Sequence, residues 1–190
     1  MSRVVIIRWL DVFLSSSGLV IMLPFLIVGF IASWMDTGSP IFRQERVGIN
    51  KRPFILYKFR TMKVGTAQVG SHLINSDRVS NLGRFMRKLK VDELPQLVNV
   101  IAGDMSLVGP RPCLASQLEV IELRDAVGIF EVKPGITGLA QLRKVNMSTP
   151  DELAVVDRQM LDKLNVLSYL GYLLLTLKGA GSGDAILRDH

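Results

Sequence analysis

The sequence predicts an α+β fold that is mostly helical, with an N-terminal membrane helix, amphipathic helices at the membrane interface and a small β element. Three observations support this prediction. Residues 12–35 carry no charge, which is long enough to cross a bilayer core of about 20 apolar residues. Two short segments follow with the pattern of strands, and most of the later chain shows helix start and stop signals. We therefore divide the chain into a membrane segment (1–36), a main domain (37–178) and a flexible tail (179–190).

Composition limits the classes of partner. The chain has 190 residues, 48% of them hydrophobic, and a net charge of +6, which favours anionic partners such as acidic lipid or phosphorylated molecules. Aromatic residues make up only 7%, and no nucleic-acid-binding motif is visible, so nucleic acid is not an expected partner. The single cysteine, Cys113, excludes an intrachain disulfide and fits a reducing compartment.

The membrane segment has a proline near its middle and basic residues on both sides. Pro24 removes a backbone hydrogen bond and is expected to kink or break the helix. Basic flanks favour the cytoplasmic side, and here they occur at both ends. A kinked span and a re-entrant hairpin broken near Pro24 both fit the residues. The flanking bases are Arg3, Arg8, Arg43, Arg46, Lys51 and Arg52.

The next segments predict two strands and a basic helix. Residues 41–47 and 53–62 read as strands joined by a turn at 48–50, and residues 64–77 read as a loop. Ser80 or Asn81 is a suitable cap for a helix that runs to about Lys90. Its apolar residues Leu82, Phe85, Met86 and Leu89 share one face, with basic residues on the others. This pattern fits a helix in the membrane interface or a basic surface helix packed on a core.

Further helices are predicted in the second half. One begins at Asp92 and ends at Gly103, and another covers residues 117–126. Residues 134–142 are rich in Gly and Thr and read as a loop. Residues 149–152 (TPDE) form a predicted capping box for a helix that reaches Leu164. Residues 164–177 are strongly apolar but short for a span, so we predict a buried or interfacial helix.

Adjacent acids and several cations are the candidates for chemistry. Asp92 and Glu93 fit helix capping, and they also fit a carboxylate nucleophile with an acidic partner. Lys58 and Arg60 are two residues apart on a predicted strand, so both project from one face. Arg111 stands between two prolines, Pro110 and Pro112, and its guanidinium can grip a phosphate. Arg87 lies just over one turn before Asp92. Each cation alone also fits a solvated surface charge.

Several other kinds of site are excluded. The only histidines are His72 and His190, so a zinc cluster and the serine- and cysteine-protease triads are excluded. Walker A and dinucleotide-binding fingerprints are absent.

Six motifs stand out along the chain. They are residues 42–48 (FRQERVG), 58–62 (KFRTM), 82–88 (LGRFMRK), 92–100 (DELPQLVNV), 103–112 (GDMSLVGPRP) and 133–141 (KPGITGLAQ). Together they closely resemble the bacterial sugar transferase family, the monotopic phosphoglycosyl transferases. The resemblance extends from about residue 8 to residue 177, and the motifs are together highly specific.

The resemblance implies transfer of a sugar 1-phosphate from a UDP-sugar to undecaprenyl or another polyprenyl phosphate, with release of UMP. Asp92 would attack the sugar-linked phosphate and bind Mg²⁺, and Glu93 would be its partner. Phosphate and substrate contacts would come from Lys58, Arg60, Arg87, Arg111, Thr137 and Gln141, with Pro110 and Pro112 structural at the site.

The resemblance also implies a location and partners. The membrane helix would be re-entrant, with its break at Pro24 and both ends cytoplasmic, at the cytoplasmic face of the bacterial inner membrane. Anionic lipid and a second copy in a homodimer would be further partners. The reaction would be the first membrane step of glycoconjugate assembly.

Two positions depart from the family pattern. Leu23 precedes Pro24 where many relatives have serine, which puts the angle of the break in doubt. No acid occurs between Asp162 and Asp184, where many relatives carry one before the last apolar helix. A catalytically silent scaffold that binds nucleotide sugars is the competing class, but the acidic pair and the basic set are intact, which favours an enzyme.

Overall fold

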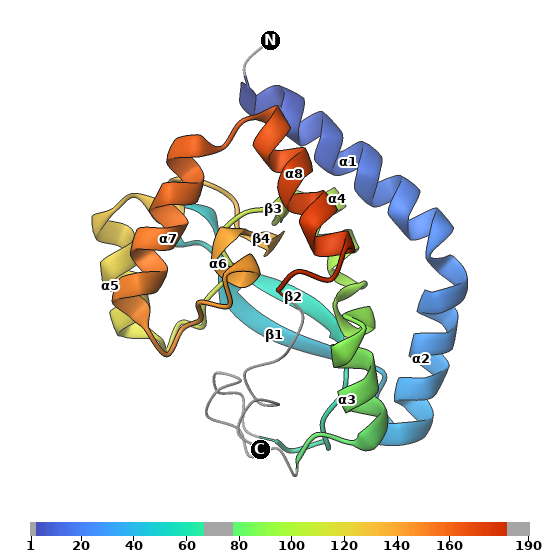
Figure 1. Ribbon diagram of the computed structural model, residues 1–190. Coiled ribbons are helices and arrows are strands. Elements are labelled where there is room, and N and C mark those ends of the chain that lie inside the picture. Colours follow the sequence, from blue (N-terminus) through green and yellow to red (C-terminus); the bar gives the residue numbers. More distant parts are fainter. Residues whose placement is uncertain (1–2, 67–77, 182–190) are drawn as a thin grey trace.

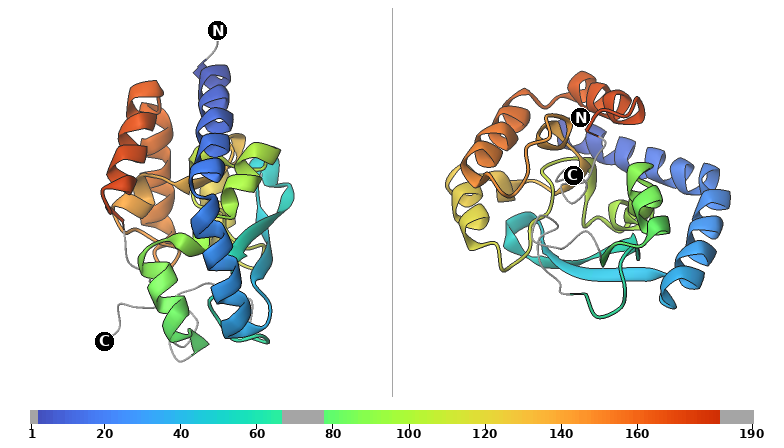
Figure 2. Two further views of the ribbon diagram at one scale, coloured as in Figure 1. Left: turned by 90° about the vertical axis from the view of Figure 1, so that its right-hand side faces the viewer. Right: turned by 60° about the horizontal axis from the view of Figure 1, so that its bottom comes forward.

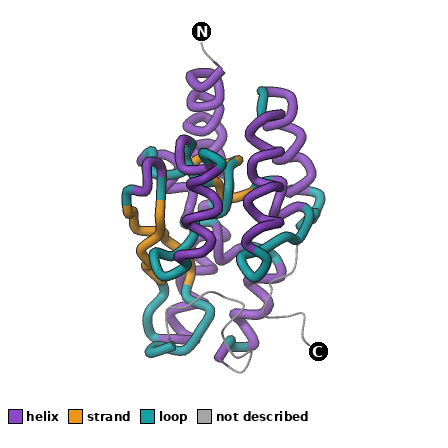
Figure 3. The backbone as a smooth tube through the Cα atoms, turned by 90° about the vertical axis from the view of Figure 1, so that its left-hand side faces the viewer, coloured by secondary structure: helices purple, strands orange, loops and turns teal. Residues whose placement is uncertain are grey.

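The computed structural model describes residues 3–66 and 78–181, and it confirms a mostly helical α+β fold (Figure 1). Helices lie around two small β elements, and Figure 3 shows how little of the chain is strand. Both histidines, most of the predicted loop at 64–77 and the predicted tail from residue 182 lie outside the described residues.

Two apolar helices, α1 (Arg3–Ile21) and α2 (Leu23–Thr37), begin the chain and are separated at Met22. Pro24 lies in the first turn of α2, where a missing amide proton costs little. The apolar segment is thus interrupted close to Pro24, and Figure 1 shows an open bend rather than a closely paired hairpin. Among the described residues, one helix, Arg3–Ile21, is long and apolar enough to cross a membrane by length and composition.

Buried polar contacts hold α1 to the rest of the molecule. Arg8, which the sequence presents as a flanking charge, donates to the carbonyls of Val100 (2.6 Å) and Ile101 (2.9 Å) at the end of α4 (Gln96–Ala102). The Asp11 carboxylate is 2% exposed and accepts hydrogen bonds from Ser106 Oγ (2.9 Å) and two further donors. The first helix is thus part of the folded domain.

Helix α2 packs on the strand pair. Gly29 lies so close to Phe59 that a Cβ atom there would be 2.8 Å from the ring. The buried Ser33 hydroxyl lies 2.7 Å from the Arg60 carbonyl and 3.0 Å from that of Pro40. Figure 2 shows both helices along one side of the molecule. Their outward faces are apolar and exposed. Their exposed residues include Trp9, Phe13, Val20, Phe25, Val28, Trp34 and Met35.

Strands β1 (Ile41–Val47) and β2 (Pro53–Phe59) form an antiparallel hairpin. The prediction for β1 is confirmed, whereas β2 ends three residues before the predicted Met62. Lys58 pairs with Phe42 and lies on the same face as Gln44 and Arg46, because side chains alternate along each strand. The turn between the strands is a 3₁₀ turn at Ile49–Lys51.

Helix α3 (Asn81–Lys88) begins at the predicted cap, where the Ser80 hydroxyl accepts from the Gly83 amide at 2.8 Å. Its apolar residues do not share one environment. Met86 is buried, whereas Phe85 and Leu89 are 59% and 55% exposed beside the exposed Arg84. The inner side of α3 therefore packs on the domain while its outer side is both apolar and basic.

A parallel strand pair was not predicted. β3 (Ser106–Val108) pairs with β4 (Gly135–Thr137), and α6 (Leu139–Leu142) follows at once, so the prediction of a loop at 134–142 is wrong. The pairing depends on a backbone approach that only glycines allow. A Cβ atom on Gly135 would lie 2.0 Å from the amide nitrogen of Gly109.

The remaining helices are α5 (Leu118–Ala126), α7 (Pro150–Lys163) and α8 (Val166–Leu177), with a 3₁₀ turn at Ile129–Glu131. Helix α7 begins where predicted, but the capping box is wrong because the Thr149 side chain makes no capping bond. A capping box occurs instead at α8, between Asn165 and Ser168. Helix α8 buries Tyr169 and exposes Leu167 and Leu177, so it is buried on one side only.

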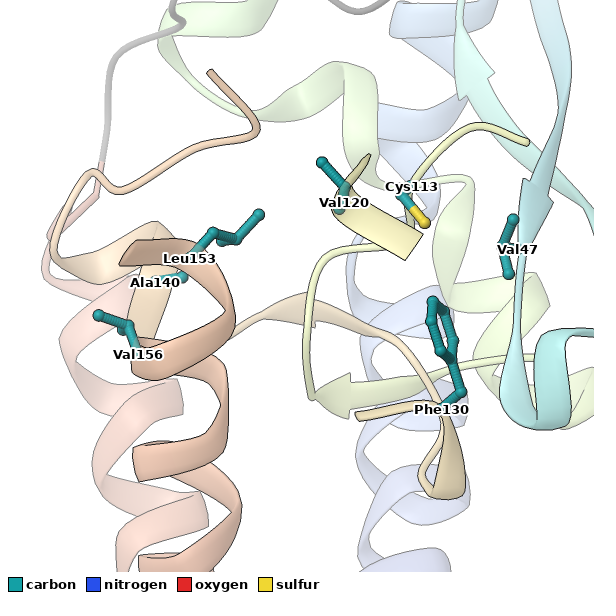
Figure 4. Close-up of a cluster of buried hydrophobic side chains, with 7 residues drawn as sticks. All are labelled: Val47, Cys113, Val120, Phe130, Ala140, Leu153 and Val156. Carbon is teal, nitrogen blue, oxygen red and sulfur yellow. The ribbon is translucent and has the colours of Figure 1, made fainter. Parts of the chain in front are cut away.

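Two hydrophobic clusters support the domain. The first lies among β1, α5, α6 and α7 (Figure 4) and consists of Val47, Cys113, Val120, Phe130, Ala140, Leu153 and Val156. The second joins β2, α4, β3, α7 and α8 and consists of Leu56, Val100, Met105, Leu107, Val108, Met160 and Tyr169. Residues 109–113 connect the β3 part of the second cluster to Cys113 of the first.

Candidate active site

The acidic pair lies in a 3₁₀ turn, Val91–Glu93, between α3 and α4. Lys90 precedes it in the left-handed conformation (φ 57°), which turns the chain sharply after α3. The predicted helix start at Asp92 is wrong, because α4 begins at Gln96 and its N-cap residue is Pro95. Asp92 is therefore not the cap of this helix, and it is only 6% exposed.

Glu93 is the centre of a charged cluster. Its Oε1 accepts from Lys58 Nζ at 2.8 Å and from Arg111 Nη2 at 2.8 Å. Burial alone would raise the pKa of Glu93, but the two cations outweigh burial and hold its pKa below the ordinary value. Burial lowers the pKa of Lys58, and the Glu93 and Asp92 carboxylates oppose that shift. The side chains of Lys58 and Glu93 are 17% and 13% exposed, so this pair is well shielded from water, whereas Arg111 is 39% exposed.

Arg46 is a further cation at this cluster that the sequence did not single out for chemistry. Its guanidinium donates to the Pro112 carbonyl at 3.0 Å and to Gln44 Oε1 at 2.5 Å. Burial, together with the positive charge of Arg111, lowers the pKa of Arg46 to about 10. Arg46 follows Gln44 by two residues on the same strand, so both side chains lie on one face.

Asn99 positions the two halves of the cluster. It is completely buried, donates from Nδ2 to the Ile55 carbonyl (2.7 Å) and accepts from the Tyr57 amide (3.1 Å). The side chain thereby hydrogen-bonds to β2 much as a neighbouring strand would. Because Lys58 follows Tyr57 on β2, this contact sets α4 and the acidic turn before it against Lys58.

The other predicted site residues lie in surrounding elements. Arg60 Nε donates to the Ser39 carbonyl at 3.0 Å, and Arg87 Nε donates to Thr61 Oγ1 at 2.8 Å. Thr137 Oγ1 lies 2.7 Å from Thr176 Oγ1 of α8. The side-chain amide of Gln141 is buried and makes no hydrogen bond within the described residues. The structure thus brings together Asp92, Glu93, Lys58 and Arg111, with the remaining residues around them.

The acids at the site suit one kind of metal ion. Within residues 3–66 and 78–181, no group of three or more His, Cys, Asp and Glu side chains is arranged to hold a metal by itself. Mg²⁺ is typically bound by one or two carboxylates together with substrate phosphates. Asp92 and its neighbour Glu93 fit that requirement.

Comparison with known proteins places the chain among the bacterial sugar transferases. The family model described as bacterial sugar transferase matches residues 2–182. The uncharacterized sugar transferase EpsL of Bacillus subtilis is 43% identical over 76% of this chain and 71% of its own length. A UDP-glucose:undecaprenyl-phosphate glucose-1-phosphate transferase of Caulobacter vibrioides is 38% identical, over 75% of this chain and 55% of that protein. An undecaprenyl-phosphate galactose phosphotransferase of Salmonella typhimurium is 37% identical, over 71% of this chain and 32% of that protein. The chain thus spans less than two thirds of the length of the last two proteins.

Proposed function

The chain belongs to the bacterial sugar transferase family, and we propose that it transfers a sugar 1-phosphate from a UDP-sugar to a polyprenyl phosphate such as undecaprenyl phosphate. The observation that carries this proposal is the placement of Asp92 next to Glu93, whose carboxylate holds Lys58 and Arg111 in one cluster. A nucleophile beside paired cations suits attack on a diphosphate. The names of the two relatives above, which act on undecaprenyl phosphate, support the same substrate class.

The reaction has two steps. First, an Asp92 carboxylate oxygen attacks the phosphorus that bears the sugar. The bond from that phosphorus to the bridging oxygen breaks, and UMP leaves with the electron pair, so an acyl phosphate that carries the sugar remains on Asp92. Second, a phosphate oxygen of the polyprenyl phosphate attacks the same phosphorus and releases the carboxylate. The product is a polyprenyl diphosphate sugar.

Glu93 acts through its cations in this proposal. Because its pKa lies below the ordinary value, its carboxylate is a weak proton acceptor at neutral pH. Its two short ion pairs favour a role in holding Lys58 and Arg111 toward the phosphates. Arg111 can then grip phosphate oxygens with its planar guanidinium. Asp92 would hold Mg²⁺, which supplies charge neutralisation for the diphosphate when bound.

The membrane helices support a re-entrant arrangement at the cytoplasmic face of the inner membrane. Near its start, α1 is bound to the domain through Arg8 and Asp11, and near its end α2 is bound to the same domain through Ser33. A straight span would place these attachments on opposite sides of the bilayer. A bent helix that enters and leaves on one side places both at one surface, and the exposed apolar residues between them then contact lipid.

Helix α3 suits the same surface. Its exposed Phe85 and Leu89 would contact the apolar interface, while the exposed Arg84 and Lys88 would meet anionic headgroups. The polyprenyl phosphate would reach Asp92 from this side, because α3 leads directly into the acidic turn. Such a product would start assembly of a bacterial glycoconjugate.

The test is UMP release by the purified protein in detergent or nanodiscs, across a panel of UDP-sugars with undecaprenyl phosphate. We expect sustained UMP release with at least one UDP-sugar, and strong dependence on the lipid phosphate. Absence of release with the whole panel, from a protein shown to be folded, would contradict the proposed function.

A further inference from the structure

Four consecutive backbone carbonyls around Arg111 are each held by a different part of the molecule. The Pro110 carbonyl accepts from the Gly135 amide at 2.8 Å, and the Cys113 carbonyl accepts from the Val47 amide at 3.0 Å. Between them, the carbonyls of residues 111 and 112 accept from two arginine side chains, Arg124 Nη1 (2.8 Å) and Arg46 Nη1 (3.0 Å). Pro110 and Pro112 have no amide proton, so the carbonyl is the one backbone group through which each of them can form a hydrogen bond.

The Arg124 side chain is fixed by a buried acid. Arg124 on α5 is 2% exposed, and its Nε (3.0 Å) and Nη2 (2.6 Å) both donate to Oδ2 of Asp157 on α7, which has no solvent exposure. Burial raises the pKa of Asp157, and Arg124 opposes that shift. Two donors of the guanidinium thus go to Asp157, and a third reaches the Arg111 carbonyl.

A buried ion pair of this kind contributes little net stability to a fold. Desolvation of both charges offsets much of their attraction, and apolar residues of similar volume often stabilise a protein equally well. Apolar residues would fill the space between α5 and α7, but they would not donate a hydrogen bond to Arg111. The pair therefore adds a directional contact to the residue that carries the candidate phosphate-binding guanidinium.

We propose that Arg124 and Asp157 are positioning residues for the transfer reaction, which act by fixing the backbone of Arg111, with Arg46 fixing the next residue. This inference rests on the proposed function, because it takes Arg111 as a group that meets substrate phosphate. The Arg111 side chain reaches Glu93 at 2.8 Å from a backbone that is held on both sides. When that backbone moves, the guanidinium loses its alignment with Glu93 and with the diphosphate.

The double variant Arg124→Met/Asp157→Leu separates positioning from stability. It removes both charges and keeps most of the volume, so we expect a folded protein whose melting temperature lies within a few degrees of the wild type. We expect kcat/KM for the UDP-sugar to fall roughly 10- to 100-fold, because misplacement by about 1 Å can cost that much. The matched control is Arg158→Gln/Asp162→Asn, which removes an exposed Arg–Asp pair on α7 and should leave kcat/KM unchanged.

A second background tests whether the effect passes through Arg111. An Arg111→Lys protein already lacks the planar guanidinium at this position. Adding Arg124→Met/Asp157→Leu to it should therefore lower kcat/KM by less than threefold relative to Arg111→Lys alone. A full additional loss in that background would overturn the inference, as would wild-type kcat/KM in the folded double variant.

If the double variant does not fold, the single variant Arg124→Lys tests the inference. One ammonium group cannot reproduce the three hydrogen bonds that the Arg124 guanidinium makes to Asp157 and to the Arg111 carbonyl, so we expect a folded protein with clearly lowered kcat/KM. Wild-type kcat/KM in this variant would overturn the inference. Failure of the proposed function is distinguishable from all of these results, since the wild-type protein would then release no UMP.

Discussion

Replacing Asp11 by leucine should destabilise the whole domain, although Asp11 lies in the first membrane helix. The change removes the acceptor of three hydrogen bonds, from Ser106 Oγ, the Leu107 amide (2.8 Å) and the Tyr169 hydroxyl (2.7 Å). All three donors are then left without this partner in a site where Asp11 is 2% exposed. Removal of one member of a buried charged network costs about 3–5 kcal/mol. For a chain of this size, that corresponds to a fall of roughly 10 °C in melting temperature.

The assay is thermal unfolding in detergent, followed by intrinsic tryptophan fluorescence. Tyr169→Phe removes one hydrogen bond to a charged acceptor and should cost about 1.5–3 kcal/mol alone, but much less when Asp11 is already leucine. Asp125→Leu is the control, because its ion pair with Lys51 is about half exposed, and we expect a cost below about 1 kcal/mol. A melting temperature for Asp11→Leu within 2 °C (roughly 1 kcal/mol) of the wild type would refute the view that α1 is integral to the domain.

Other outcomes follow from the same structure. Because the fold lowers the pKa of Glu93, the contribution of this carboxylate to stability is complete above its unfolded pKa of about 4.3 and is lost as the pH falls toward its folded pKa. The difference in unfolding free energy between the wild type and Glu93→Gln should therefore narrow below about pH 4. A difference that does not depend on pH would contradict this. Gly29→Val should cost about 1–3 kcal/mol in chemical denaturation, because its Cβ would lie 2.8 Å from Phe59, whereas Gly171→Val has nothing within 4 Å and should lose none of this packing. An impermeant thiol reagent added to intact cells should label a cysteine at neither end of the α1–α2 segment, and labelling of one end alone would indicate a span.

The sequence predicted the elements and helix ends that are determined by residues close together in the chain. The β1 strand, the Ser80 cap and the Gly103 end of α4 each follow from a few neighbouring residues, and each is found in the structure. The β3–β4 pair could not be predicted in this way. Its strands have three residues each and are joined through a distant glycine contact, so the alternation of side chains is too short to detect.

Long-range polar contacts account for the site residues that the sequence did not indicate. Asn99, Arg46 and Arg124 are held by partners far along the chain, and no spacing rule connects them. One signal was present for Asp157. It lies on the buried face of α7 with Leu153 and Met160, and a charge on an apolar face requires a partner. The acidic pair itself was found because two adjacent acids precede an apolar helix, although the sequence placed the helix start too early.

The most direct test of the central claim is the mass of the intact protein after mixing with a suitable UDP-sugar in the absence of lipid phosphate. We predict a covalent adduct with the mass of the sugar phosphate, with up to one UMP released for each protein molecule. The adduct should be absent from Asp92→Asn, which keeps the shape of the side chain but lacks an anionic nucleophile, and present in the control Asp125→Asn. An adduct retained in a verified Asp92→Asn chain, or mapped by fragmentation to another residue, would show that Asp92 is not the nucleophile.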